Sequence, residues 1–156
     1  MTSERVKTLL IVAHAPSPNT KKIVQAIQTA VSKNTGLNII TLTPFKTTKQ
    51  SIQAADGVVF FTPENFGYMS GALKDLFDRT YYDVIETKRG TPYALIVRAG
   101  KDGTGCKRAV ESILKGLGWR ACQAPLILLG EHKTSFEKEA ANLTNAVASG
   151  LELGII

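Results

Sequence analysis

The fold of this chain is decided by residues 6–13, which read Val-Lys-Thr-Leu-Leu-Ile-Val-Ala. A short, nearly continuous apolar run of this kind is typical of a strand buried on both faces of a parallel sheet. Outward from it, four more runs predict strands, at 38–43, 57–62, 92–99 and 121–129, the last weakened in its first half by Pro125. Apolar residues at helical spacing predict helices between them, with stripes that begin at Ile23, Leu73, Cys106 and Phe136 and a short helix at 51–55.

The alternation of strands and helices predicts an α/β domain with a five-stranded parallel sheet and helices on both faces. Five strands suit an open, doubly wound sheet, because a barrel needs about eight. The 156 residues contain no linker, repeat or low-complexity segment, so we expect a single domain over residues 1–156. Such sheets bind ligands beyond the carboxyl ends of their strands. The loops after the first, third and fourth predicted strands therefore form the candidate site.

The composition excludes several classes of protein. With 44% apolar and 21% charged residues, the chain is neither a disordered tail nor a disulfide scaffold. No apolar run approaches the roughly 18 residues that span a bilayer, so no membrane span is expected. Residues 1–7 lack the pattern of a signal peptide, and the two cysteines, Cys106 and Cys122, have no metal-ligand spacing. We expect a cytoplasmic protein.

The net charge of +6 is concentrated near the N-terminus, where residues 1–50 hold seven Lys and Arg residues against one acid, Glu4. Such a region can attract a phosphate-bearing ligand or nucleic acid, or it can be a solvated surface rich in lysine. Nucleic-acid modules place aromatic side chains among their basic residues. The first fifty residues contain one aromatic residue, Phe45, so we expect no nucleic-acid partner.

The first candidate loop, residues 14–20, leaves a buried strand and enters a helix. Open N–H groups and the helix dipole make such a position an anion site, to which Ser17, Asn19 and Thr20 add side-chain donors. The same residue types are also those of an ordinary N-cap, so both interpretations stay open. The loop is not a P-loop, since it lacks the Gly-x-x-x-x-Gly-Lys-Ser/Thr pattern.

The other two loops have different chemistry. The second, residues 62–71, carries Phe66, Tyr68 and Met69, which either stack on a flat ligand or pack beneath the loop as a local core. The third, residues 99–105, has three glycines whose backbone N–H groups face whatever lies above the sheet, although a flexible turn is an equal alternative. This third loop matches neither the P-loop nor the dinucleotide fingerprint.

No set of side chains with the composition of a catalytic site is evident. His14 and His132 are isolated, and Cys106, at a predicted helix N-terminus, fits a small buried residue better than a reactive thiol. A ligand site without an acid–base pair indicates that a cofactor supplies the chemistry.

Taken together, the three loops resemble the flavodoxin-like superfamily. The most specific stretch is residues 62–78, Thr-Pro-Glu-Asn-Phe-Gly-Tyr-Met-Ser-Gly-Ala-Leu-Lys-Asp-Leu-Phe-Asp. It is similar to the flavin loop of NAD(P)H-dependent FMN reductases and flavodoxin-like quinone reductases, where Pro-x-x-x-Gly-x-x-(Ser/Pro)-Gly-x-(Leu/Met)-Lys is typical. The first loop differs from that of flavodoxins, because it carries Pro18 in place of the usual Thr/Ser-Gly pattern.

The resemblance implies a strand order of 2-1-3-4-5 and bound FMN. It places the phosphate on residues 16–20 and the ring between residues 63–69 and 100–105. The implied cofactor-binding residues are Ser17, Asn19, Thr20, Pro63, Glu64, Asn65, Phe66, Gly67, Tyr68, Met69, Gly100, Lys101, Asp102, Gly103, Thr104 and Gly105.

The resemblance implies an oxidoreductase that takes electrons from NAD(P)H and passes them through FMN to a quinone or similar small acceptor. A partner subunit of a homo-oligomer would complete the site. One alternative is a flavodoxin-type electron carrier that serves a redox partner protein, although the charge of +6 argues against the acidic surface usual for such carriers. Another is a binding domain of the same fold without cofactor.

Overall fold

The computed structural model describes residues 5–34 and 36–156. The expectation that residues 1–7 carry no targeting segment falls partly on residues 1–4, which lie outside the described residues. In chain order the elements are β1 (Thr8–Ala13), α1 (Pro18–Val31), β2 (Asn38–Leu42), η1 (Pro44–Lys46), α2 (Lys49–Ala54), β3 (Gly57–Asn65), β4 (Tyr68–Met69), α3 (Gly71–Val84), β5 (Pro92–Ala99), α4 (Thr104–Gly116), β6 (Arg120–Ala121), β7 (Leu126–Leu129) and α5 (Thr134–Leu153).

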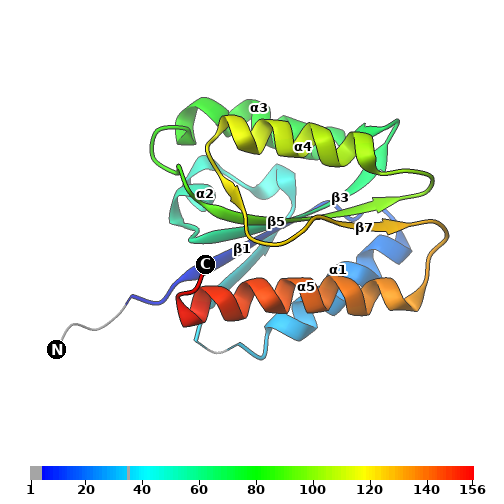
Figure 1. Cartoon of the computed structure of the whole chain (residues 1–156), viewed down its shortest axis with the longest axis horizontal. Helices are drawn as coiled ribbons and strands as arrows, with labels where there is room; N and C mark the ends of the chain where they lie inside the picture. The colour runs from blue at the N-terminus through cyan, green and yellow to red at the C-terminus, as the bar shows by residue number, and fades with distance from the viewer. Residues whose placement is uncertain (1–4, 35) are drawn as a thin grey trace.

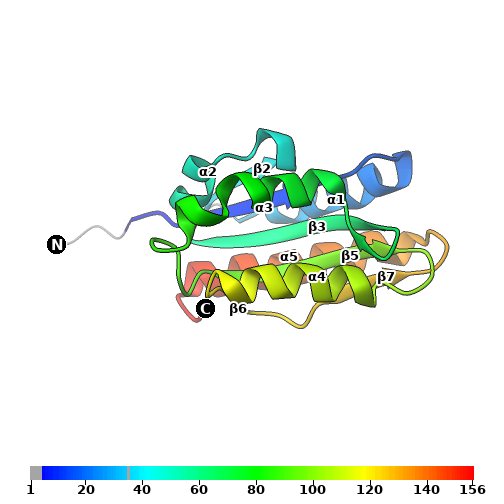
Figure 2. The same cartoon turned by 90° about the horizontal axis from the view of Figure 1, so that it is seen from above.

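The sheet is parallel in the order β2-β1-β3-β5-β6, with β7 also paired to β5. This is the expected order 2-1-3-4-5, with the fifth strand divided in two. Helices α1 and α5 cover one face of the sheet, and α2, α3 and α4 cover the other (Figures 1 and 2). The prediction of an open, doubly wound α/β fold is confirmed.

Two local predictions need correction, so the described sheet has seven strands rather than five. The run 121–129 is interrupted between β6 and β7, because Pro125 has no N–H to give to the ladder. The segment predicted as a loop after β3 is instead a hairpin, in which β3 continues to Asn65 and pairs antiparallel with β4. Hydrophobic periodicity did not reveal the hairpin, because its two arms are too short to show alternation.

Aromatic packing fills the layer beneath α3 and α4. The ring of Phe60, on the central strand β3, lies 5.6 Å from Phe77, 6.5 Å from Tyr93 and 6.1 Å from Trp119, measured between ring centroids. These residues come from two strands, one helix and the segment before β6, so one cluster joins the elements of this face. On the opposite face, β1 and β3 pack against α1 and α5 through mostly aliphatic side chains, together with Phe61 and Phe136.

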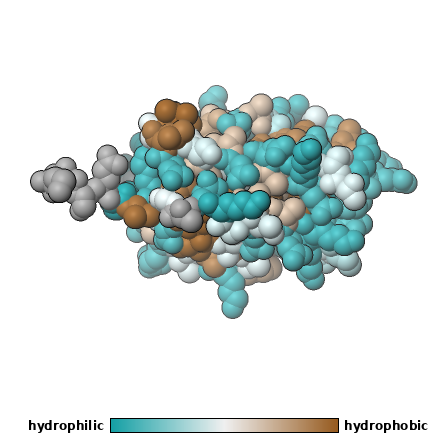
Figure 3. Space-filling view, turned by 90° about the horizontal axis from the view of Figure 1, so that it is seen from below, coloured by the Kyte–Doolittle hydropathy of each residue, from teal (hydrophilic) through white to brown (hydrophobic). Residues whose placement is uncertain are grey.

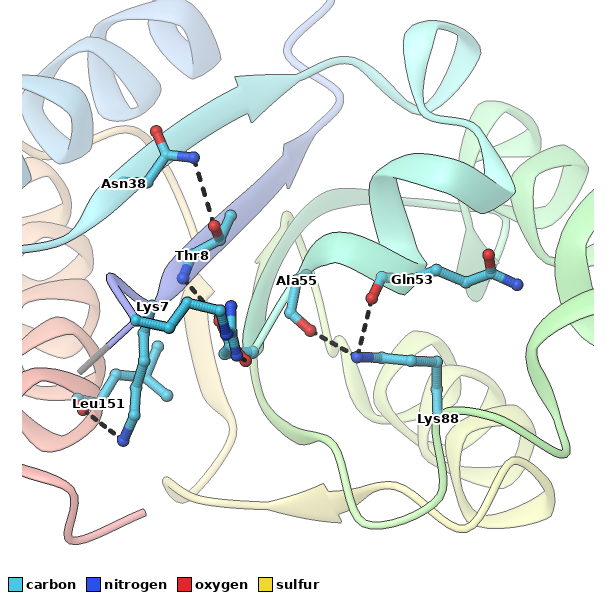
Figure 4. Close-up of polar contacts among 9 residues, drawn as sticks. Lys7, Thr8, Asn38, Gln53, Ala55, Lys88 and Leu151 are labelled. Carbon is cyan, nitrogen blue, oxygen red and sulfur yellow. Dashed lines mark hydrogen bonds and ion pairs between the residues drawn. The ribbon is translucent and has the colours of Figure 1, made fainter. Parts of the chain in front are cut away.

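Polar contacts hold together the end of the sheet at which the parallel strands begin, here called the amino edge (Figure 4). Asp56 accepts a hydrogen bond from the Thr8 N–H at 2.8 Å and forms an ion pair with Arg5. Lys88 donates to the carbonyl of Ala55 at 2.6 Å, and Lys7 donates to that of Leu151 at 3.1 Å. These bonds attach the start of β1 to β3 and to α5.

The face formed by α1 and α5 is largely hydrophilic, with apolar side chains gathered at the end of the molecule where β1 begins (Figure 3). There, Val6, Leu37 and Leu153 line a hollow of about 580 Å³ together with charged side chains such as Arg5 and Glu152. This hollow lies at the amino edge, away from the loops that sequence analysis selects.

Replacement of Asp56 by Asn should make the free energy of unfolding less dependent on pH in the acidic range. Partial burial alone would raise the pKa of Asp56, but hydrogen bonds from Arg5 and Thr8 and the charges of Arg5 and Lys88 outweigh it and lower the pKa. The Asp56 carboxylate therefore stabilises the folded state at a pH above its pKa in the unfolded chain, near 3.9. This stabilisation is lost as the pH falls through the pKa of Asp56 in the folded state. Urea unfolding at pH 7 should show D56N about 1 kcal/mol less stable than the parent.

The difference between parent and D56N should shrink toward zero at pH 3. Asp83→Asn removes an exposed carboxylate that forms no ion pair with the described residues, and it serves as the control. A difference for D56N that stays constant from pH 7 to pH 3 would contradict the role of the Asp56 charge.

Candidate functional site

The three selected loops lie together at the carboxyl ends of the strands, here called the carboxyl edge, because β1, β3 and β5 run parallel. The N–H of His14 donates to the carbonyl of Phe61 at 3.0 Å, which ties the first loop to β3. The second and third loops touch directly, since a Cβ atom at Gly105 would collide with the carbonyl oxygen of Gly67. Only glycine permits this approach of the hairpin to the first turn of α4.

In the first loop, Ser17 and Thr20 form a reciprocal N-cap for α1. The Thr20 N–H donates to Ser17 Oγ at 3.1 Å, and the Ser17 N–H donates to Thr20 Oγ1 at 3.0 Å. Pro18 occupies the first helical position and has no N–H to offer. Within the described residues, the backbone N–H and side chain of the exposed Asn19 have no hydrogen-bond partner, so Asn19 is a free donor of this loop.

The hairpin of the second loop has a strained and exposed tip. Phe66 has a φ of 54° and Gly67 a φ of 74°, the left-handed conformation of a two-residue hairpin turn. Asn or Gly is usual at the first of these positions, and a bulky aromatic residue there is costly. The Phe66 side chain is nevertheless fully exposed, and that of Tyr68 is 41% exposed. Strain combined with apolar exposure indicates a binding role.

The interpretation of these side chains as a local core therefore holds only for Met69, which is 2% exposed. Below the tip, Thr62 and Ser70 are joined by buried hydrogen bonds: Thr62 Oγ1 donates to Ser70 Oγ at 3.2 Å and accepts from the Ser70 N–H at 3.1 Å. Ser70 also caps α3, since it accepts from the Leu73 N–H. These buried hydrogen bonds thus fix the base of the hairpin relative to α3.

Glu64, on the β3 arm of the hairpin, has a buried oxygen, Oε2, without a hydrogen-bond partner among the described residues. A buried carboxylate oxygen that lacks a donor is costly, unless a ligand supplies one. Burial raises the pKa of the Cys106 thiol to about 12, and the charge of Glu64 adds to the effect. Cys106 is fully buried, as the sequence predicts for a small residue on the helix stripe.

The third loop leaves open donors at α4. Gly103 is the N-cap residue, with a φ of 85°, and a Cβ atom there would lie 2.6 Å from Ile127. Because glycine has no side chain, no cap hydrogen bond is made, and the N–H groups of Thr104, Gly105 and Cys106 lack acceptors within the described part of the chain. Lys101 and Asp102 are exposed, as is Gly100, and Asp102 accepts from Thr104 Oγ1 at 2.7 Å.

Arg98 is a residue of this edge that sequence analysis missed. It is the penultimate residue of β5, where its guanidinium donates to the carbonyls of Ala99 at 2.6 Å and Leu128 at 3.2 Å and lies 4.9 Å from the ring centroid of Phe136. Partial burial lowers the pKa of Arg98. The signal in the sequence was a single charged residue within the apolar run 92–99.

These residues fit a flat, phosphorylated cofactor unequally. The ring side has two exposed aromatic side chains beside an uncapped helix N-terminus. The phosphate side is poorer, because Ser17 and Thr20 are bonded to each other and Pro18 replaces a donor. In the described ranges, no cluster of three or more His, Cys, Asp or Glu side chains is arranged to hold a metal ion. None of the described helices is both long and apolar enough to cross a bilayer.

Comparison with known proteins agrees with this geometry. A family model described as NADPH-dependent FMN reductase matches residues 38–133, more than half of the chain. No curated protein sequence matches significantly.

Among solved structures, a flavodoxin from the domain Archaea superposes with a TM-score of 0.78 at 14% identity, over 93% of this chain and 99% of that one. The general stress protein 14 of Treponema denticola, in complex with FMN, superposes with a TM-score of 0.66 at 18% identity, over 93% and 99% of the two chains. At these identities the structures establish the fold alone, and the family model adds the family. The chain therefore has the flavodoxin-like fold and belongs to the NADPH-dependent FMN reductase family.

Proposed function

We propose that the chain binds FMN at the carboxyl edge of its sheet and transfers electrons from NAD(P)H through it to a quinone or similar acceptor. The observation that carries the proposal is the exposed, strained Phe66 beside Tyr68, on a hairpin that contacts the uncapped N-terminus of α4. When bound, FMN supplies a ring that accepts a hydride and gives up electrons. Membership of the reductase family supports this chemistry.

The chain itself orients the ring and stabilises charge. Phe66 and Tyr68 offer apolar faces on which a ring can stack and from which water is excluded. The open N–H groups at the start of α4 and the exposed loop at Gly100 favour negative charge on a ring edge, because the helix dipole is positive there. The third loop has no aromatic residue, which leaves room for a nicotinamide or quinone.

Asn19 is the residue we assign to the phosphate, with help from the helix dipole of α1 and the nearby Lys21 and Lys22. The other residues of the proposed site are those that the resemblance implies at 63–69 and 100–105. We further propose that residues 1–156 act as one domain. Because Cys106 and Cys122 form no disulfide, a reducing compartment such as the cytoplasm suits the chain.

An electron carrier is the second candidate, because the flavodoxin from Archaea resembles this chain over nearly its whole length. A binding domain without cofactor is the third, favoured by the self-capped first loop with Pro18. The charge of +6 argues against the carrier, since usual carrier partners are basic.

The absorption spectrum of the purified protein with added FMN separates these functions. We expect a bound flavin band that bleaches when NADH or NADPH is added and returns when a quinone is supplied. A band that bleaches with dithionite but with neither nucleotide would assign the carrier function. Absence of any FMN binding would leave the domain without cofactor.

Phe66→Asn should change stability and FMN affinity in opposite directions. Asn adopts a positive φ at low cost, so the free energy of unfolding should rise by about 0.5–1 kcal/mol. The loss of ring stacking should weaken FMN binding by about 1–3 kcal/mol, as for stacked bases. Urea unfolding and fluorescence titration with FMN measure the two effects. Tyr82→Asn, which changes an 86% exposed tyrosine on α3, should leave FMN affinity unchanged. An unaltered affinity in F66N would remove Phe66 from the site.

Asn19→Ala tests the phosphate position. The substitution should weaken FMN binding about tenfold, the effect of one charge-assisted hydrogen bond, and leave riboflavin binding nearly the same. Riboflavin lacks the phosphate and serves as the internal control. Equal losses for both ligands would show that Asn19 acts on the ring or on the fold instead.

A further inference from the structure

The edge strand β2 presents unpaired backbone groups to solvent. Among the described strands, only β1 pairs with it. The Asn38 N–H donates to the carbonyl of Lys7 at 2.9 Å, so Asn38, Ile40 and Leu42 face β1. Because a strand alternates, Ile39 and Thr41 direct their N–H and C=O groups away from the sheet. Neither residue has another backbone partner in the described structure.

This edge lacks the usual protection against pairing with another chain. Residues 38–42 contain no charged residue and no proline, and the nearby apolar side chains of Ile40 and Phe45 are 36% and 65% exposed. The opposite edge is protected, since β6 has two residues and Pro125 separates it from β7. Edge strands of natural proteins normally carry such features, which prevent pairing with another chain. In this sheet one edge strand lacks them, which indicates a docking position at that edge.

The stretch of sequence that contains β2 is basic. No Asp or Glu occurs from residue 5 to residue 55, a stretch that contains seven Lys and Arg residues. Lys21 on α1, Lys46 in η1 and Lys49 in α2 are exposed, and none forms an ion pair with the described residues. Helices α1 and α2 lie on opposite faces of the sheet, so these lysines flank β2 on both sides.

One of these lysines shares a helix face with a hollow beside the strand. Gln28 and Ser32 of α1 line a hollow of about 320 Å³ together with Ile39 and Thr41 of β2. Lys21 precedes them at helical spacing and so lies on the same face of α1. Side chains of an added strand would pack into this hollow, and Lys21 lies about two helical turns away from Gln28.

We propose that the β2 edge binds an extended, acidic segment of a partner protein, which adds a strand to the sheet. The backbone groups of Ile39 and Thr41 supply the pairing, and the lysines select acidic side chains. A second copy of this chain fits less well, because it would bring the same lysines face to face. Nucleic acid fits less well too, since Phe45 is the one exposed aromatic side chain within residues 5–34 and 36–55. The pairing groups of Ile39 and Thr41 do not belong to the proposed FMN site, whereas Lys21 is shared with it.

Amide hydrogen exchange with a synthetic probe tests the proposal. The probe is a blocked nine-residue peptide in which glutamate alternates with valine or threonine. At about ten times its Kd, it should slow exchange of the Ile39 and Thr41 amides about tenfold. The amides of Asn38, Ile40 and Leu42 already face β1 and should change little. A peptide with lysine for glutamate, or with two central prolines, should give no protection.

Two sets of variants separate charge from backbone pairing. K46E/K49E should weaken binding of the acidic peptide about tenfold, whereas K115E/K138E, an equal charge change at exposed sites on α4 and α5, should weaken it far less. Thr41→Pro removes an outward N–H that makes no hydrogen bond within the sheet, so the edge strand should tolerate it. This variant should abolish protection of the Ile39 amide by the peptide, whereas Thr41→Val should retain the protection. FMN titration of each variant should match the parent.

Several outcomes would overturn the proposal. The first is an acidic peptide that leaves the Ile39 and Thr41 amides unprotected, and the second is equal binding of the lysine peptide. Protection that rises with protein concentration without peptide would assign the edge to a second copy. A single-stranded oligonucleotide that binds through Lys46 and Lys49 without protecting the amides would assign the lysines to nucleic acid.

Discussion

The pairing of β3 with β1 on one side and β5 on the other is the constraint on which the rest of the structure depends. Residues 57–62 of β3 are buried on both faces, so this strand joins the two hydrophobic layers. The same strand then continues past the core to Asn65 and forms one arm of the hairpin. The position of the hairpin is therefore set by the most buried strand of the protein, which gives an exposed tip a rigid base.

Two of the helices that begin at the carboxyl edge, α1 and α4, differ in how their first N–H groups are capped. The N-terminus of helix α1 has a capping box, in which the hydroxyl groups of Ser17 and Thr20 accept hydrogen bonds from the backbone. Helix α4 begins at Gly103, which has no side chain, and its first N–H groups stay open. The positive end of a helix dipole is strongest where no side chain satisfies it. The edge therefore attracts negative charge more at α4, beside the aromatic tip, than at α1, where the resemblance places the phosphate.

Charge is also divided between two regions of the molecule. The acid-free stretch from residue 5 to residue 55 surrounds the edge strand β2, whereas ion pairs with partners four residues apart lie on α3 and α4. The proposed FMN site and the basic edge share Lys21 on α1 but are otherwise formed by different residues.

The sequence by itself determined the α/β class, the order of the main strands and helices and the positions of the three connections at the carboxyl edge, and it offered Ser17 as a candidate helix cap. These follow from local periodicity and from residue types that act on their immediate neighbours. Only the tertiary structure decided that Phe66 is exposed at a positive φ, that Gly105 touches Gly67, and that Arg98 lies over Phe136. Each of these depends on contacts between segments far apart in the chain or on a turn too short to leave a pattern, and burial and contact are properties of the packed chain rather than of its local sequence.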